Sequence, residues 1–98
     1  MKKKFKDISS IRKLIDDIDI KILNLISERK ELVTEVVKLK SREQIIDKKR
    51  IESMIKKLNK HGKEKNLPHG LVDKLWRTMI MEFITYEENI FDDIHKRN

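Results

Sequence analysis

The chain has 98 residues, of which 24 are Lys or Arg and 17 are Asp or Glu, giving a formal net charge of +7. This length favours a single domain, 1–98, although a monomer of this size buries only part of its apolar surface. The absence of cysteine excludes disulfides and thiolate metal sites, and the presence of only 2 Gly and 1 Pro favours long helices over a sheet.

The charge and the N-terminus bear on partners and location. Of the 24 basic residues 18 are Lys, and most alternate with acids; the one dense run, Lys2–Lys4, lies in a segment, 1–8, that we expect to be a flexible basic tail. We therefore expect a solvated Lys-rich surface, no nucleic-acid partner and a small anionic substrate. No apolar run is long enough for a signal peptide or a membrane span, which predicts a cytoplasmic protein without a membrane partner.

The first helix is predicted from a long apolar seam that begins at Ile11, behind the capping segment that starts at Asp7, and runs to about Lys40. A helix of about 30 residues is roughly 45 Å long, too long to fold back inside one small globule. It needs a partner along its length, and a second copy of the chain is the simplest one. The seam residues step by three and four except between Leu25 and Leu32, where Arg29 takes the intervening position: Ile11, Ile15, Ile18, Ile22, Leu25, Leu32, Val36 and Leu39.

Two shorter helices follow a predicted loop at Ser41–Gln44. Asp47 is placed to cap the second helix, a turn is expected at 66–68, and Pro68 suits the start of the third helix. The fold class is therefore all-α, with a long, a short and a medium helix per chain in an intertwined antiparallel homodimer. The apolar faces are Ile51, Met54, Ile55 and Leu58, then Val72, Trp76, Ile80, Phe83, Ile90 and Ile94.

Two charges interrupt the apolar seams: Arg29 in the first helix and Glu87 in the third. A charge in a helix interface is costly unless it is paired or binds a ligand. One interpretation is an Arg29–Glu87 ion pair that sets the register of the helices. The other is a ligand site, because Lys40 lies eleven residues after Arg29 on the same predicted helix face, about 16 Å along it.

Arg12 borders the same seam but lies about 25 Å before Arg29, too far for both to hold one small ligand. In an antiparallel pair of first helices, Arg12 of one chain approaches Arg29 of the other. This predicts two equivalent sites per dimer and, from two arginines and a lysine, a substrate with two carboxylates.

No conventional catalytic group accompanies these cations. The sequence has no Gly-rich phosphate loop, no metal-ligand spacing and no nucleophile beside a base, so neither a metal nor a cofactor is predicted. His61, His69 and His95 are scattered and are expected at the surface. Such a site orients a substrate and stabilises charge electrostatically.

Three motifs resemble the all-helical chorismate mutases, and together they cover about residues 9–91. They are Ile11-Arg12-x-x-Ile15-Asp16-x-x-Asp19; then Ile26-Ser27-Glu28-Arg29-x-x-Leu32 with Val36-x-x-x-Lys40; and Ile45-Ile46-Asp47-Lys48-Lys49-Arg50. The resemblance implies rearrangement of chorismate to prephenate, a pericyclic reaction that needs neither nucleophile nor base.

The resemblance also implies a role for each matched residue. Lys40 would hydrogen-bond the ether oxygen of the breaking bond, and Glu87 would be its second contact. A protonated Glu87 would do so as a donor, so activity would rise towards acidic pH and Glu87→Gln would flatten that dependence. The remaining contacts would be Arg12 from the partner chain, Arg29 and Arg50 on the carboxylates, and Asp47 near the substrate hydroxyl.

Three departures from the family pattern keep alternatives open. Ile51 stands where the mutases usually have Glu, Phe83 replaces a small hydroxyl residue of some members, and the loop between Lys40 and Asp47 is about two residues short. The related isochorismate-pyruvate lyases also have an apolar residue at the position of Ile51. The alternatives are therefore that lyase activity or a 4-amino-4-deoxychorismate mutase, and more remotely a helical nucleic-acid-binding module.

Overall fold

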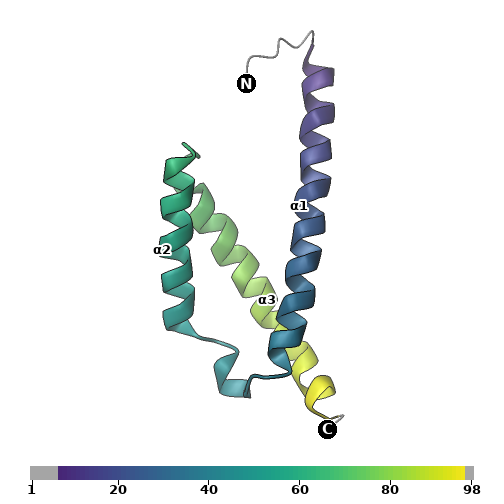
Figure 1. Ribbon diagram of the computed structural model, residues 1–98, viewed down its shortest axis with the longest axis vertical. Coiled ribbons are helices and arrows are strands. Elements are labelled where there is room, and N and C mark those ends of the chain that lie inside the picture. The colour runs from purple at the N-terminus through teal and green to yellow at the C-terminus, as the bar shows by residue number, and fades with distance from the viewer. Residues whose placement is uncertain (1–6, 97–98) are drawn as a thin grey trace. The chain divides into compact units, whose positions relative to one another are not determined.

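The computed structural model describes residues 7–96, which form three α-helices and one short 3-10 helix (Figure 1). Within this part of the chain there is no strand, so the predicted all-α class with a long, a short and a medium helix is confirmed. The elements are α1 (Ile8–Val37, 30 residues), η1 (Arg42–Gln44), α2 (Lys48–Glu64, 17 residues) and α3 (Leu71–Lys96, 26 residues). None of these helices is long and apolar enough to cross a membrane.

The start of α1 follows the predicted capping segment. Asp7 Oδ1 accepts a hydrogen bond of 2.8 Å from the Ser10 backbone N–H, and this bond lowers the pKa of the Asp7 carboxyl. Ile8 is already helical. The flexible tail predicted for 1–8 therefore does not include Ile8, and residues 1–6 lie outside the described residues.

The end of α1 differs from the prediction. The helix stops at Val37, and the backbone N–H groups of Leu39 and Lys40 turn back to the Val36 carbonyl at 2.9 and 3.1 Å. Lys40 therefore lies in a tight turn beyond the helix. The expectation that it continues the helical face of Arg29 is wrong, because the helix ends three residues too early.

The loop predicted at Ser41–Gln44 contains η1. The Ser41 backbone N–H donates to Gln44 Oε1 at 2.8 Å, and the Gln44 N–H donates to the Ser41 carbonyl at 3.1 Å. Asp47 then caps α2 as predicted, because its Oδ1 accepts a hydrogen bond of 3.0 Å from the Arg50 backbone N–H.

The turn between α2 and α3 is longer than the sequence suggested. α3 begins at Leu71 rather than at Pro68, whose carbonyl accepts a turn bond of 3.1 Å from the Leu71 N–H. Gly70 precedes the helix at a φ of 83°, a left-handed conformation that favours glycine. The proline therefore shapes the turn, and the glycine sets the direction in which α3 begins.

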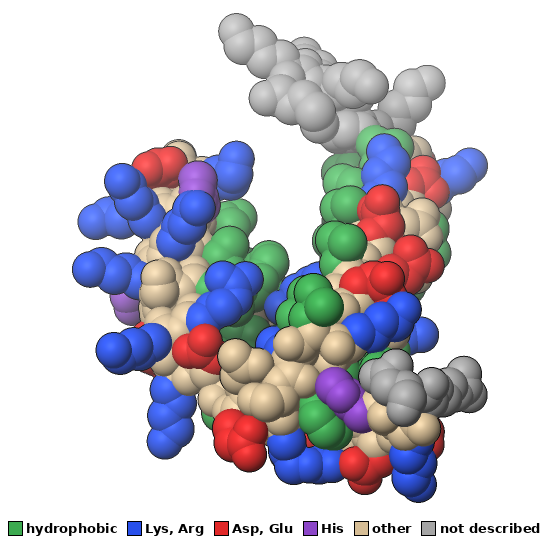
Figure 2. All heavy atoms as spheres, turned by 60° about the horizontal axis from the view of Figure 1, so that its bottom comes forward, with side chains coloured by type: hydrophobic (Ala, Val, Ile, Leu, Met, Phe, Trp, Pro, Cys, Tyr) green, Lys and Arg blue, Asp and Glu red, His purple; other side chains and the backbone are tan. Residues whose placement is uncertain are grey.

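The chain divides into two compact units, residues 1–32 and 33–98, with the boundary inside α1. In the described part of the first unit no residue is buried. Figure 2 shows hydrophobic side chains uncovered along α1. The exposed seam residues of this unit include Ile11, Ile15, Ile18, Ile22, Leu25 and Leu32.

The second unit has its own core, in which α2 and α3 run in opposite directions and pack together (Figure 1). Its buried cluster consists of Ile45, Ile55, Ile80 and Ile84. Burial of each such side chain contributes about 1.5–3 kcal/mol. Ile84, which the predicted apolar face omitted, is buried, whereas Phe83 is only half-buried.

Two further contacts join α2 to α3. Gly62 is buried, and a Cβ placed on it would lie 2.6 Å from Val72 Cγ2, so the helices meet where α2 has no side chain. At the surface, Arg77 on α3 binds both carboxylate oxygens of Glu52 on α2 at 2.9 and 3.0 Å and also binds Asp73 at 3.0 Å.

Candidate active site

A half-buried lysine and a buried glutamate form an ion pair at the position where Glu87 interrupts the apolar face of α3. Lys40 Nζ lies 3.0 Å from Glu87 Oε1, and the two side chains are 25% and 9% exposed. The turn after α1 supplies Lys40, and the middle of α3 supplies Glu87. Glu87 is the only buried charged residue in the described part of the chain. Because burying a charge is costly, such a position is a candidate for a functional site.

The pair places a half-buried ammonium beside a buried carboxyl group. Removing one partner would leave the other charge buried and uncompensated, which is strongly unfavourable. An incoming polar group can instead share the hydrogen-bonding capacity of both, since an ammonium has three donors and a carboxyl group has two oxygens. The arrangement can therefore orient a ligand oxygen and stabilise negative charge on it.

The turn that carries Lys40 is fixed to α3 at a second point. His95 Nε2 lies 3.0 Å from the Val37 carbonyl oxygen, and the His95 ring stacks on Phe91 with centroids 4.0 Å apart. Sequence reasoning expected a surface histidine here. The signal that could have revealed it is the spacing of Glu87, Phe91 and His95, which four-residue steps place on one helix face.

The other predicted site residues of the second unit lie on or next to α2 and α3. Asp47 and Arg50 are exposed in the first turn of α2, where the Asp47 carboxylate is engaged in capping the helix. Ile51, which replaces the usual Glu of the family, is half-buried and packs against the core cluster. Its side chain therefore adds to the apolar packing of the second unit. Phe83 is half-buried, with its ring edge-on to Tyr86 at 6.3 Å.

Arg12 and Arg29 belong to the first unit, both on α1. Arg12 is exposed and Arg29 is half-buried. Their approach to the Lys40–Glu87 pair, including the predicted contribution of Arg12 by a second chain, stays a prediction.

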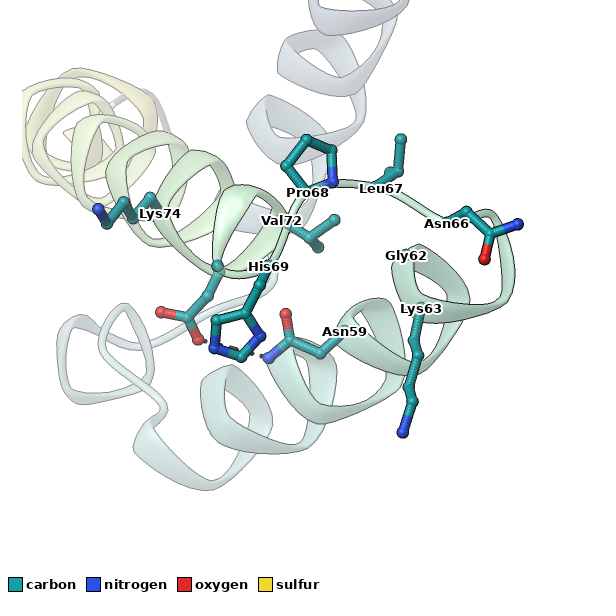
Figure 3. A pocket seen from close by; sticks show the side chains of 11 residues that line it. Asn59, Gly62, Lys63, Asn66, Leu67, Pro68, His69, Val72 and Lys74 are labelled. Atoms are coloured by element: carbon teal, nitrogen blue, oxygen red, sulfur yellow. Dashed lines mark hydrogen bonds between the residues drawn. The ribbon is translucent and has the colours of Figure 1, made fainter.

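A pocket lies elsewhere in the second unit, at the corner between α2 and α3 (Figure 3). Val72, Leu67 and Pro68 supply its apolar lining, and Asn59, Lys63 and His69 are among its polar residues. None of the predicted site residues lines it, and no acid is buried in it. The buried charge of the second unit therefore lies at the Lys40–Glu87 pair and not in this surface pocket.

Two further features of the described residues bear on possible ligands: potential metal-binding side chains and the distribution of basic side chains. Among residues 7–96, no group of three or more His, Asp or Glu side chains is arranged to hold a metal ion. Lys and Arg side chains gather over α2 (Figure 2), in keeping with the expected Lys-rich surface.

Comparisons with known proteins agree with the helix motifs. The model of a family described as chorismate mutase type II matches residues 11–88. A bifunctional chorismate mutase/prephenate dehydratase of Buchnera aphidicola subsp. Schizaphis graminum is 30% identical over 88 residues, which cover 88% of this chain but 23% of that protein. A chorismate mutase of Methanocaldococcus jannaschii is 29% identical over 93 residues, covering 93% of this chain and 94% of that protein. No solved structure matches significantly.

Proposed function

The chain belongs to the type II chorismate mutase family, and we propose that it rearranges chorismate to prephenate at a site centred on Lys40 and Glu87. At the level of the family, the predicted chorismate mutase function and isomerase class are confirmed, and neither the lyase nor the 4-amino analogue is favoured. The observation that supports the proposed site is the Lys40–Glu87 pair, in which a half-buried ammonium lies 3.0 Å from a buried carboxyl group on the apolar face of α3.

The mechanism follows from what this pair can offer. In the rearrangement a carbon–oxygen bond breaks as a carbon–carbon bond forms, and negative charge develops on the ether oxygen. Lys40 donates a hydrogen bond to that oxygen, and its ammonium stabilises the charge most strongly in the transition state. Glu87, in its protonated form, donates the second hydrogen bond to that oxygen. Arginines on the substrate carboxylates hold the folded reactive conformer.

The site is completed, in this proposal, by a second copy of the chain. The uncovered seam of α1 supports an antiparallel homodimer, because an exposed apolar stripe of this length favours burial against another helix. Each site then takes Arg12 from the partner chain and Arg29, Arg50 and Asp47 from its own. The reaction draws on no metal or cofactor, and the cytoplasmic location stays a prediction.

The first experiment assays the purified protein with chorismate and with isochorismate and identifies the products. We expect prephenate from chorismate, with kcat lowered about 10²- to 10³-fold in Lys40→Ala. Glu87→Gln keeps a hydrogen-bonding amide and should retain more activity than Glu87→Ala. Lys38→Ala is the matched control, since Lys38 is exposed and paired with Glu35. Salicylate and pyruvate from isochorismate, or full activity in Lys40→Ala, would overturn the proposal.

A mixing experiment tests whether sites are shared between two chains. Arg12→Ala and Lys40→Ala are each made, mixed in equal amounts, and unfolded and refolded together. If Arg12 acts across the dimer, each mixed dimer contains one intact site, so activity recovers to about a quarter of the wild-type value. No recovery, with mixed dimers shown by mass spectrometry, would mean that both residues serve the same chain's site.

A further inference from the structure

We infer that His95 is a positioning residue for Lys40, acting through the Val37 carbonyl at the end of α1. This inference rests on the proposed role of Lys40. His95 lies near the C-terminal end of α3, two turns beyond Glu87, and does not itself enter the reaction.

The first step of the argument is the carbonyl that His95 binds. Val37 is fully buried and ends α1, where a helix leaves carbonyl groups without partners inside the helix. The Val37 oxygen lies 3.0 Å from His95 Nε2 and also accepts a 3.3 Å hydrogen bond from the Lys40 backbone N–H. One oxygen thus connects the imidazole to the backbone of Lys40.

The second step is that α3 holds both ends of the same residue. The Lys40 side chain is bound by Glu87, and its backbone is linked through Val37 to His95. Glu87 and His95 lie on one face of a single helix, about 12 Å apart along it. They therefore hold Lys40 at two fixed points, its side chain and its backbone. The Lys40 side chain has four rotatable bonds, so without restraint at both ends its ammonium would sample many positions.

The third step is the support of His95 itself. Its ring is half-buried and stacks on Phe91, and the Arg42 guanidinium lies over the Phe91 ring at 4.7 Å from the centroid. Arg42 is in turn paired with Asp92 on α3. The segment just after Lys40 is therefore also bound to α3. Stacking on Phe91 fixes the orientation of the imidazole ring, so that Nε2 can donate to the Val37 carbonyl.

The geometry predicts the kinetic signature of His95→Ala. Loss of the donor should let the turn at Lys40 shift, and a misplacement of this kind costs about tenfold in kcat with little change in KM. His95→Gln restores a donor and should recover part of the loss, whereas His95→Phe keeps only the stacking and should not. His69→Ala is the control, since His69 is exposed in the turn between α2 and α3.

A double-mutant cycle separates positioning from general stability. In the Lys40→Ala background, adding His95→Ala should leave kcat unchanged, because the residue that His95 positions is already absent. Thermal melting shows whether each variant is folded. An equal fall of kcat in both backgrounds, or wild-type kcat in a folded His95→Ala protein, would overturn the inference. If Lys40→Ala alone is fully active, the proposed function itself fails, which is a distinct result.

Discussion

The two units of the chain bury their apolar residues very differently. The second unit, 33–98, has a closed isoleucine cluster between α2, α3 and the segment before α2. The first unit carries an apolar seam of comparable regularity, yet none of its described residues is buried. Ile18 is 54% exposed, whereas Ile55 is 3% exposed.

The comparison shows that an apolar pattern specifies a helix face but does not identify what covers it. In the second unit the covering element is the next helix along the chain. Within the first unit no described residue is buried, so the exposed apolar pattern favours burial against a second molecule. We therefore expect association to depend on the first unit and local stability to depend on the second.

The largest expected effect is on association. Ile18→Lys places a charge in the seam of α1, where burial of an unpaired ammonium costs several kcal/mol. We expect the dissociation constant of the proposed dimer to rise by at least about 100-fold, measured by analytical ultracentrifugation, with activity lost in parallel. Ile20→Lys is the matched control, because Ile20 is equally exposed at 57% but lies on the opposite face of the helix. Equal weakening by both substitutions would refute the seam as the interface.

A smaller effect is expected inside the second unit. Gly62→Ala gains about 1 kcal/mol of helix propensity but brings a methyl group against Val72, a stiff β-branched side chain. Overpacking costs about 1–3 kcal/mol, so we expect a net loss of unfolding free energy. In a Val72→Ala background the clash is removed, and the same substitution should become stabilising. Denaturant unfolding measures both, and a stabilised single variant would contradict the close approach of the two helices.

The smallest effect is expected from the surface contact between α2 and α3. Hydrogen bonds from Arg77 are the main cause that lowers the pKa of both Glu52 and Asp73. A carboxyl with a lowered folded-state pKa contributes stability above its unfolded pKa, near 4, and loses it as pH falls through the folded value. Arg77→Gln should therefore lower Tm by roughly a few degrees at most at pH 7, and the difference should vanish in strong acid.

Salt provides the control for this last prediction. All three side chains are substantially exposed, so high salt should reduce the Tm difference between wild type and Arg77→Gln at pH 7. A difference that persists unchanged in acid would mean that Arg77 stabilises the helices by packing rather than by charge.

Much of the fold follows from local pattern. The seam of α1 and the cap at Asp47 were readable because helical periodicity and capping depend on residues three and four apart. Element ends were less accurate, as at Val37 and Pro68, because a helix can stop wherever a turn satisfies its last backbone groups. Arg29 and Glu87 could be identified from the sequence as candidate site residues because they interrupt apolar seams, where a charge is costly in any fold.

The direct partner of Glu87 required the tertiary structure. The spacing of the sequence does not predict the contact of Lys40 with Glu87 or of Val37 with His95. The members of these pairs are 47 and 58 positions apart along the chain, and they meet only because α3 packs beside the end of α1. The helix class, the apolar faces and the family motifs are encoded in short-range periodicity. The pairing of the buried charge and the anchoring of the lysine turn are long-range contacts, and only packing decides them.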